Sequence, residues 1–154
     1  MKNKPKDLLE LNPYAKVPVL VDGDGVIYES AIVNEYLDEK FPATRLLPAD
    51  YLKRARVRIW VDFFNSRIHP TAGDIAHKRD VEKATKHMYA HLATLDRELA
   101  GKNFIADDYS LADVTFIPFY TRRERYGVTI DDNYPNLKRW GESLIARPAV
   151  AATL

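Results

Sequence analysis

The sequence contains no cysteine, and this absence excludes several kinds of chemistry at once. Without a thiol there is no disulfide framework, no cysteine-based metal site and no cysteine nucleophile. A chain that uses no disulfides suits a reducing compartment, so we expect a cytoplasmic protein.

Other features are also missing. No apolar run approaches the roughly 20 residues that a membrane-spanning helix requires, and the basic start of the chain is not followed by the apolar segment of a signal peptide. The 23 basic and 22 acidic residues nearly cancel to a net charge of +1, so no overall field attracts nucleic acid or a membrane surface. There is no glycine-rich phosphate loop, zinc-protease helix motif or serine-nucleophile elbow.

What is present is typical of a folded globular protein. The chain has 154 residues, of which 46% are hydrophobic and 11% aromatic. This composition excludes an intrinsically disordered chain. The length suits one domain or two small packed ones.

The first part of the chain alternates between helix and strand signals. A short helical turn over residues 7–11 ends at Asn12-Pro13, because the residue before a proline is pushed out of helical geometry. The β-branched run of residues 17–22 predicts a strand, and Asp22-Gly23-Asp24-Gly25 predicts a hairpin that returns through residues 26–28.

From Ser30 the apolar period becomes helical. Ser30 is a natural N-cap, and Phe41-Pro42 ends this helix. We expect its buried stripe to contain Ile32, Val33, Tyr36, Leu37 and Phe41.

Everything after Asp50 predicts helix. Asp50 caps a first helix, which we expect to break near His69-Pro70 and Gly73. Its buried face should contain Leu52, Ala55, Ile59 and Phe63, widened by Trp60 and Phe64.

Three further helices follow along the chain. Residues 80–99 repeat apolar side chains every three or four positions, and Gly101 should stop that helix. Ser110 and Asp113 form a capping box, the strongest local signature in the sequence. The last helix begins at Tyr134-Pro135 and buries Leu137, Trp140 and Leu144.

These motifs, in this order, resemble the soluble glutathione transferase superfamily, which includes non-enzymatic stringent-starvation-type relatives. The resemblance covers nearly the whole chain. It implies a mostly α fold with an incomplete thioredoxin-like α/β unit (β-hairpin plus helix) over residues 1–42, a linker over 43–49, and an all-α domain over 50–154, usually as a dimer. The matching pieces are Asn12-Pro13 to Val21, Glu29-Ser30-Ala31-Ile32 to Pro42, Ser110 to Asp113, and Tyr134-Pro135-Asn136-Leu137 to Pro148.

The resemblance also implies a substrate, glutathione, whose thiolate the family conjugates to electrophiles. It implies a cis Val17-Pro18 bond, with the backbone of Val17 turned outward to pair with the extended tripeptide. Ser30 would meet the γ-glutamyl carboxylate at a helix N-terminus, where free N–H groups favour an anion. Glu29 would accept from the ammonium group, and Lys16 would meet the glycyl carboxylate.

No catalytic residue can be assigned. The family's tyrosine, serine or cysteine that acts on the glutathione sulfur lies in a strand-helix-strand segment ahead of the point that matches Asn12, so we expect this chain to be shortened at its N-terminus. Two functions stay open, a conjugating enzyme and a non-catalytic protein-interaction module of the same fold. The strand at residues 17–21 would carry an unpaired edge, through which two copies could form a homodimer or to which a partner could supply the missing strands.

Three other groups of residues have a functional and a structural interpretation. His87 and His91 lie four apart on a helix, which suits one metal ion, but no third ligand is evident and solvated histidines are the better interpretation. Basic clusters at residues 53–58 and 122–125 suit nucleic acid only weakly in a neutral chain. Arginines that flank an inter-subunit or ligand cleft are the stronger interpretation, because arginine pairs with carboxylates in a bidentate manner. An acceptor pocket, or simply apolar core, is expected from Phe63, Phe64, Arg67, Tyr120 and Tyr126.

Overall fold

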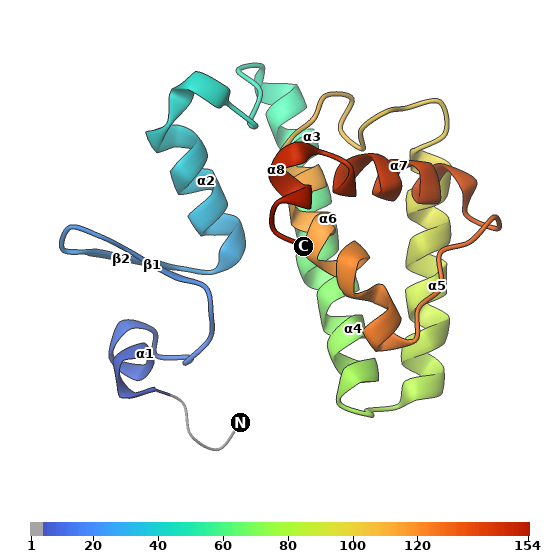
Figure 1. Cartoon of the computed structure of the whole chain (residues 1–154), viewed down its shortest axis with the longest axis horizontal. Helices are drawn as coiled ribbons and strands as arrows, with labels where there is room; N and C mark the ends of the chain where they lie inside the picture. The colour runs from blue at the N-terminus through green and yellow to red at the C-terminus, as the bar shows by residue number, and fades with distance from the viewer. Residues whose placement is uncertain (1–4) are drawn as a thin grey trace. The chain divides into compact units, whose positions relative to one another are not determined.

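The computed structural model describes residues 5–154 (Figure 1). They fall into two compact units, the first ending at Leu47 and the second beginning at Pro48. This boundary lies within the segment 43–49 that the sequence suggests as a linker. The basic residues 1–4, which entered the signal-peptide argument, lie outside the described residues.

The first unit is a β-hairpin flanked by helices. Its elements are α1 (Lys6–Leu11), β1 (Val19–Asp22), β2 (Gly25–Tyr28), α2 (Ser30–Lys40) and the 3₁₀ turn η1 (Pro42–Thr44). The strands pair antiparallel, with Val19 opposite Tyr28 and Asp22 opposite Gly25. Gly23 has a φ of 59°, the left-handed conformation that glycine adopts without a steric cost, so the predicted hairpin is confirmed.

Two side-chain contacts of Asp22 and two of Asp38 fix α2 within this unit. The Asp22 carboxylate accepts hydrogen bonds from the Tyr36 hydroxyl and the Lys40 ammonium group, which joins the turn end of the hairpin to α2. The buried Asp38 carboxylate accepts from the backbone N–H groups of Leu46 and Leu47. The segment after α2 is therefore held by a side chain of α2 itself.

The expected buried stripe of α2 is wrong in most of its members. Val33 is buried, but Ile32 is 56% exposed and Phe41 is 58% exposed. The helical spacing of apolar residues correctly predicts that this segment is a helix. Which of these residues are buried depends on the elements that pack against each face of the helix. In its own unit, α2 contacts a sheet that has only two strands within residues 5–154, together with the short turn η1.

The second unit is entirely helical. It contains α3 (Tyr51–Phe63), the π-helical turn η2 (Phe64–Ile68), α4 (His69–Ala76), α5 (Val81–Glu98), α6 (Leu111–Arg122), the 3₁₀ turn η3 (Arg123–Tyr126), α7 (Pro135–Ile145) and α8 (Pro148–Ala151). In Figure 1, α5 runs back alongside α4 after a tight turn, and α6 lies beside α3.

The first helix of this unit begins as predicted but continues further. The Asp50 carboxylate accepts from the Lys53 N–H at 2.8 Å, which confirms the cap. Instead of breaking at His69-Pro70 and Gly73, the chain makes a π-helical turn and continues as α4. Pro70 lies in the first turn of α4, where its missing N–H costs little.

The buried face of α3 also differs from the prediction. Leu52 and Ile59 are 64% and 63% exposed, whereas Val57, which lies outside the predicted face, is fully buried. Phe64 is buried as predicted, although it lies just after α3 in η2. The apolar side chains of α3 form two stripes, one that contains Ile59 and one that contains Val57. The stripe with Val57 is buried in the helical unit, where α3 packs against α6.

The predicted face of α5 is confirmed in Met88, Leu92 and Leu95, with Leu99 buried at the C-cap, whereas Val81, the first apolar residue of that face, is 43% exposed. The predicted face of α7 is confirmed, with Leu137, Trp140 and Leu144 buried.

An aspartate and a stack of aromatic rings form the centre of the helical unit. The Phe116 and Trp140 rings are stacked with centroids 4.5 Å apart, and Phe64 packs against Phe116 at 5.1 Å. The capping box of Ser110 and Asp113 is present as predicted. The Asp113 carboxylate also accepts from the Trp140 indole N–H at 2.8 Å, so the cap is tied to the core.

Candidate functional site

The residues expected to bind a small peptide meet at one end of the hairpin. Because Val19 pairs with Tyr28, the dipeptide before Val19 and the dipeptide after Tyr28 lie at the same end of the two strands. These dipeptides are Val17-Pro18 and Glu29-Ser30. Antiparallel pairing therefore brings together residues that are about a dozen positions apart in the sequence.

A buried asparagine shapes the loop that leads into this end. Asn12 is 1% exposed, and its side chain donates to the Lys16 carbonyl at 2.9 Å while accepting from the Tyr14 N–H at 2.9 Å. Ala15 adopts a φ of 49° between them. Asn12 is a structural residue that the sequence marked only as the start of an Asn-Pro turn.

The peptide bond that follows this loop is cis, as expected for Val17-Pro18. The Val17 side chain is 79% exposed, and the neighbouring Lys16 and Pro18 are exposed as well. The N–H and C=O groups of Val17 have no hydrogen-bond partner among residues 5–154. A ligand with an extended backbone could pair with both groups.

Ser30 lies one position inside the helix, so its assignment as the N-cap is wrong. Glu29 is the N-cap residue, with a φ of 71° and a ψ of 115°, and neither residue makes a side-chain capping bond. Both are exposed. Within the described chain the Ser30 hydroxyl has no partner, and it stands at a helix N-terminus where an anion is favoured.

The five residues proposed for an acceptor pocket differ in their burial and contacts. Phe64 and Tyr120 lie in the core at 0% and 2% exposure. Phe63 contacts the His91 ring edge to face, with centroids 5.7 Å apart, and the Arg67 guanidinium lies over the Phe63 ring at 5.7 Å. Of the five residues, Tyr126 lines a hollow of the helical unit.

That hollow has a volume of about 320 Å³ and is formed by α4, the end of α6 and η3. Its principal lining residues are His69, Gly73, His77, Phe119, Arg122 and Tyr126. Phe119 is 2% exposed and lies parallel to the Tyr126 ring, at a centroid distance of 6.1 Å and an interplanar angle of 4°. Burial lowers the pKa of His69, which keeps that imidazole neutral near pH 7.

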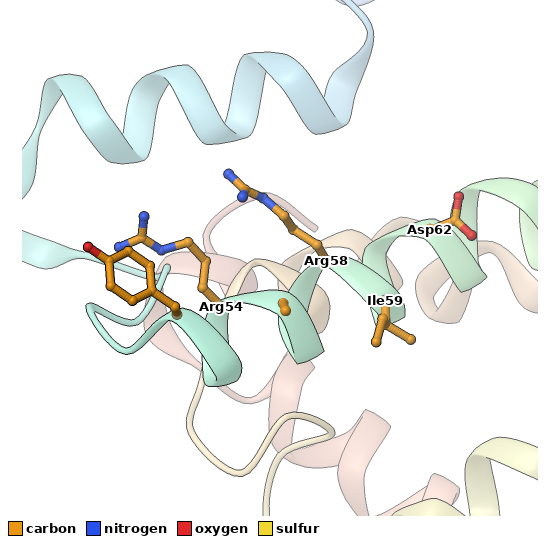
Figure 2. A pocket seen from close by; sticks show the side chains of 6 residues that line it. Arg54, Arg58, Ile59 and Asp62 are labelled. Carbon is orange, nitrogen blue, oxygen red and sulfur yellow. The ribbon is translucent and has the colours of Figure 1, made fainter.

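A second hollow follows one side of α3 (Figure 2) and has a volume of about 710 Å³. In Figure 2, Arg54 and Arg58 extend from the same side of the helix, whereas Ile59 points away from them. Arg54 donates to the Pro48 carbonyl at 2.9 Å and lies 5.8 Å from the centre of the Tyr51 ring. Arg54 is therefore engaged in holding the start of α3.

The other charges of the basic cluster on α3 are also paired. Lys53 lies 3.5 Å from Asp108, and Arg56 lies 3.7 Å from Asp107. Such pairs reduce the positive field that a nucleic-acid surface would need.

Neither a metal centre nor a membrane span is found in the described part of the chain. Across residues 5–154, no three histidine, cysteine, aspartate or glutamate side chains are placed to share a metal ion. Over the same residues, no helix combines the length and apolar character needed to cross a bilayer.

Comparison with protein families identifies both units. A model of the glutathione S-transferase C-terminal domain matches residues 61–148, and a model of the N-terminal domain matches residues 1–40. Glutathione S-transferase U24 of Arabidopsis thaliana is 35% identical over 160 residues, covering 99% of this chain and 73% of the relative. The chain belongs to the glutathione S-transferase family.

Solved transferase structures show the same fold. A glutathione S-transferase from Methylobacillus flagellatus, solved with glutathione bound, is 26% identical, with a TM-score of 0.85 over 95% of this chain and 79% of its own. A glutathione transferase from Burkholderia graminis, with two glutathione molecules per subunit, is 26% identical, with a TM-score of 0.82 over 96% of this chain and 70% of its own. The transferase fold thus accounts for the hairpin with its helix and for the helical unit.

Proposed function

We propose that this transferase-family chain binds glutathione at the open end of its hairpin and takes part in conjugating the thiolate to an electrophile. Family membership supports this proposal, as do the relatives solved with glutathione bound. The single observation that carries it is the cluster of unused polar groups at that end, namely the Val17 backbone, the Ser30 hydroxyl and the N-terminus of α2. We place the protein in the cytoplasm, where glutathione is reduced.

Each residue of the site has a role suited to the tripeptide. The backbone of Val17, beside the cis Pro18, pairs with the peptide backbone of glutathione. The Ser30 hydroxyl and the free N–H groups of α2 hold the γ-glutamyl carboxylate, while Glu29 accepts from the adjacent ammonium group. Lys16, exposed at the end of the loop, pairs with the glycyl carboxylate.

The reaction forms one bond and breaks one. The glutathione sulfur, after losing its proton to solvent, attacks an electrophilic carbon, and the leaving group departs with the electron pair of its bond. In this proposal the hairpin contributes binding and orientation of the thiol substrate, which lowers the entropic part of the barrier. We assign proton removal from the thiol to no residue of this chain.

Conjugation of glutathione to a chlorodinitrobenzene, followed by absorbance, tests this function. We expect glutathione-dependent turnover above the uncatalysed rate, and a Glu29→Gln variant with a higher KM for glutathione. Glu39→Gln is the matched control, because Glu39 is an exposed acid at the other end of α2. A rate equal to the uncatalysed one would refute the enzymatic proposal.

A second candidate function, self-association as an interaction module, is favoured by the surface of the hairpin. In the described chain the sheet has two strands, so the outer edge of β1 is unpaired. Val17 and Val21 are 79% and 52% exposed on or beside this strand. We infer a homodimer in which two β1 edges pair, since such edges are templates for another strand.

Light scattering of the wild-type chain and two variants tests this dimer. Val21→Lys should shift the mass to that of a monomer, because a charged side chain blunts a strand edge. Val26→Lys, at a 40% exposed position of β2, should leave the dimer intact. A wild-type chain that stays monomeric at high concentration would contradict the pairing.

A further inference from the structure

The pocket formed by α4, the end of α6 and η3 has one rigid aromatic wall. The Tyr126 ring is half-buried and lies nearly parallel to the fully buried Phe119 ring. Because Phe119 is fixed in the core, it holds the orientation of Tyr126. A flat aromatic ring could therefore lie against Tyr126 in offset or edge-to-face contact.

The opposite wall is made of small side chains. Ala72 and Gly73 line the pocket from α4. A Cβ added at Gly73 would meet only one atom within 4 Å, the Nη2 of Arg79 at 4.0 Å. The space beside Gly73 is therefore open. The cavity as a whole has a volume of about 320 Å³, which is at the lower end of the size range for small-molecule sites.

The pocket carries an uncompensated positive charge. Arg122 lines it and forms no hydrogen bond or ion pair with any of residues 5–154, and none of the lining residues is acidic. The two acids closest to the lining in sequence are already paired with other arginines. Asp74 lies 2.8 Å from Arg79, and Glu124 lies 3.6 Å from Arg123.

Two histidines add polar groups without adding negative charge. The Nδ1 of His77 lies 2.7 Å from the Gly73 carbonyl, which can only accept, so Nδ1 carries the proton. The Nε2 of His77 then accepts when the ring is neutral and donates when it is charged. His69, with its lowered pKa, contributes a neutral and partly apolar surface.

We propose that this pocket binds a planar aromatic carboxylate, with the ring against Tyr126 and the carboxylate paired with the Arg122 guanidinium. Arginine suits this task because its planar fork matches a carboxylate in a bidentate manner. The use of this pocket as the acceptor site for conjugation rests on the proposed transferase function, whereas binding of the carboxylate does not. The corresponding electrophiles would be aromatic compounds that carry a carboxylate.

Calorimetry with 2-naphthoate and its uncharged analogue 2-naphthamide tests the proposal on the full chain. The two probes share one ring system, so the difference in their affinity measures the contribution of the charge. We expect the carboxylate to bind about tenfold more tightly or better, as a charge-assisted pair contributes. Equal affinities, or no heat from either probe, would overturn the proposal.

Three variants locate the site. Arg122→Gln should weaken naphthoate about tenfold and leave naphthamide nearly unchanged, while Arg125→Gln, an exposed arginine of η3 outside the pocket, should change neither. Gly73→Leu should weaken both probes by filling the pocket, and it replaces a helical glycine with a better helix former, so the fold is kept. If Arg122→Gln and Arg125→Gln behave alike, the site is not here.

A separate glutathione titration distinguishes this proposal from the transferase function. Naphthoate binding without glutathione binding would leave the pocket in place and refute the transferase proposal. Glutathione binding without naphthoate binding would refute only the pocket.

Discussion

Replacing Asp113 with alanine should destabilise the helical unit more than the loss of a single N-cap would. The Asp113 side chain is fully buried and accepts from four donors. Two are the backbone N–H groups of Ser110 at 2.9 Å and Ile105 at 3.3 Å, and a third is the Trp140 indole N–H at 2.8 Å. The fourth, the Ser110 hydroxyl, can rotate to another acceptor.

The magnitude follows from the three N–H groups that would lose their acceptor. Each buried donor left without a partner costs about 1–3 kcal/mol. Burial raises the pKa of Asp113, so removing this carboxylate also recovers some desolvation energy, which favours the low end of the range. We predict a loss of about 3 kcal/mol, a large part of the roughly 5–15 kcal/mol that stabilises an ordinary domain.

Urea unfolding followed by circular dichroism and tryptophan fluorescence measures this loss. Asp108→Ala is the matched control, because that side chain is 72% exposed and its pair with Lys53 spans 3.5 Å, so we expect a change below about 1 kcal/mol. Trp140→Phe removes one donor of the network, and its effect should not add fully to that of Asp113→Ala because both break the same bond. An Asp113→Ala chain as stable as the Asp108→Ala chain would refute this reasoning.

Three further predictions concern positions where one contact decides the outcome. Gly141→Ala should lower the free energy of unfolding by about 1–3 kcal/mol in urea titrations, because its Cβ would overlap the Tyr120 ring; unchanged stability would show that the ring can move aside. Asp38→Ala should speed proteolysis of the segment after α2, since its carboxylate holds two backbone N–H groups there, and an unchanged cleavage rate would contradict this role. Burial lowers the pKa of His69, so the folded chain binds fewer protons than the unfolded one and stability is lost as pH falls below about 6.5; His69→Gln should flatten that dependence in thermal melts, and an identical dependence would refute it.

Local chemistry in the sequence was enough to predict the parts of the fold that depend on neighbouring residues. The hairpin follows from its Asp-Gly repeats, and the start of α6 follows from the spacing of Ser110 and Asp113. In each case the residues that decide the structure lie within a few positions of one another.

Burial could not be predicted in the same way. On α3, the stripe with Ile59 and the stripe with Val57 both have helical spacing, and only packing against the rest of the unit selects the second. On α2, helical spacing predicts that Ile32 and Phe41 are buried, whereas the structure exposes both.

Of the two candidate sites, one could be predicted from the sequence and the other could not. The hairpin end could be predicted as a candidate site because the family resemblance names Val17 and Ser30. The pairing of the two strands then places these residues at the same end of the hairpin. The pocket around Arg122 and Tyr126 could not, because its other wall comes from Gly73, nearly fifty residues earlier, and no local pattern joins them. The sequence marks Tyr126 as a candidate pocket residue and shows an arginine cluster at residues 122–125, but no local pattern indicates the wall from α4.

Calorimetric titration of millimolar glutathione into the wild-type chain and into Ser30→Ala tests the central claim most directly. We predict saturable binding to the wild type and an affinity about ten- to a hundredfold lower for Ser30→Ala, which loses one hydrogen bond to a charged group. Ser66→Ala, at an exposed serine of the helical unit, should bind like the wild type. Heat from the wild-type chain equal to the heat of dilution would contradict the assignment of the hairpin end as a glutathione site.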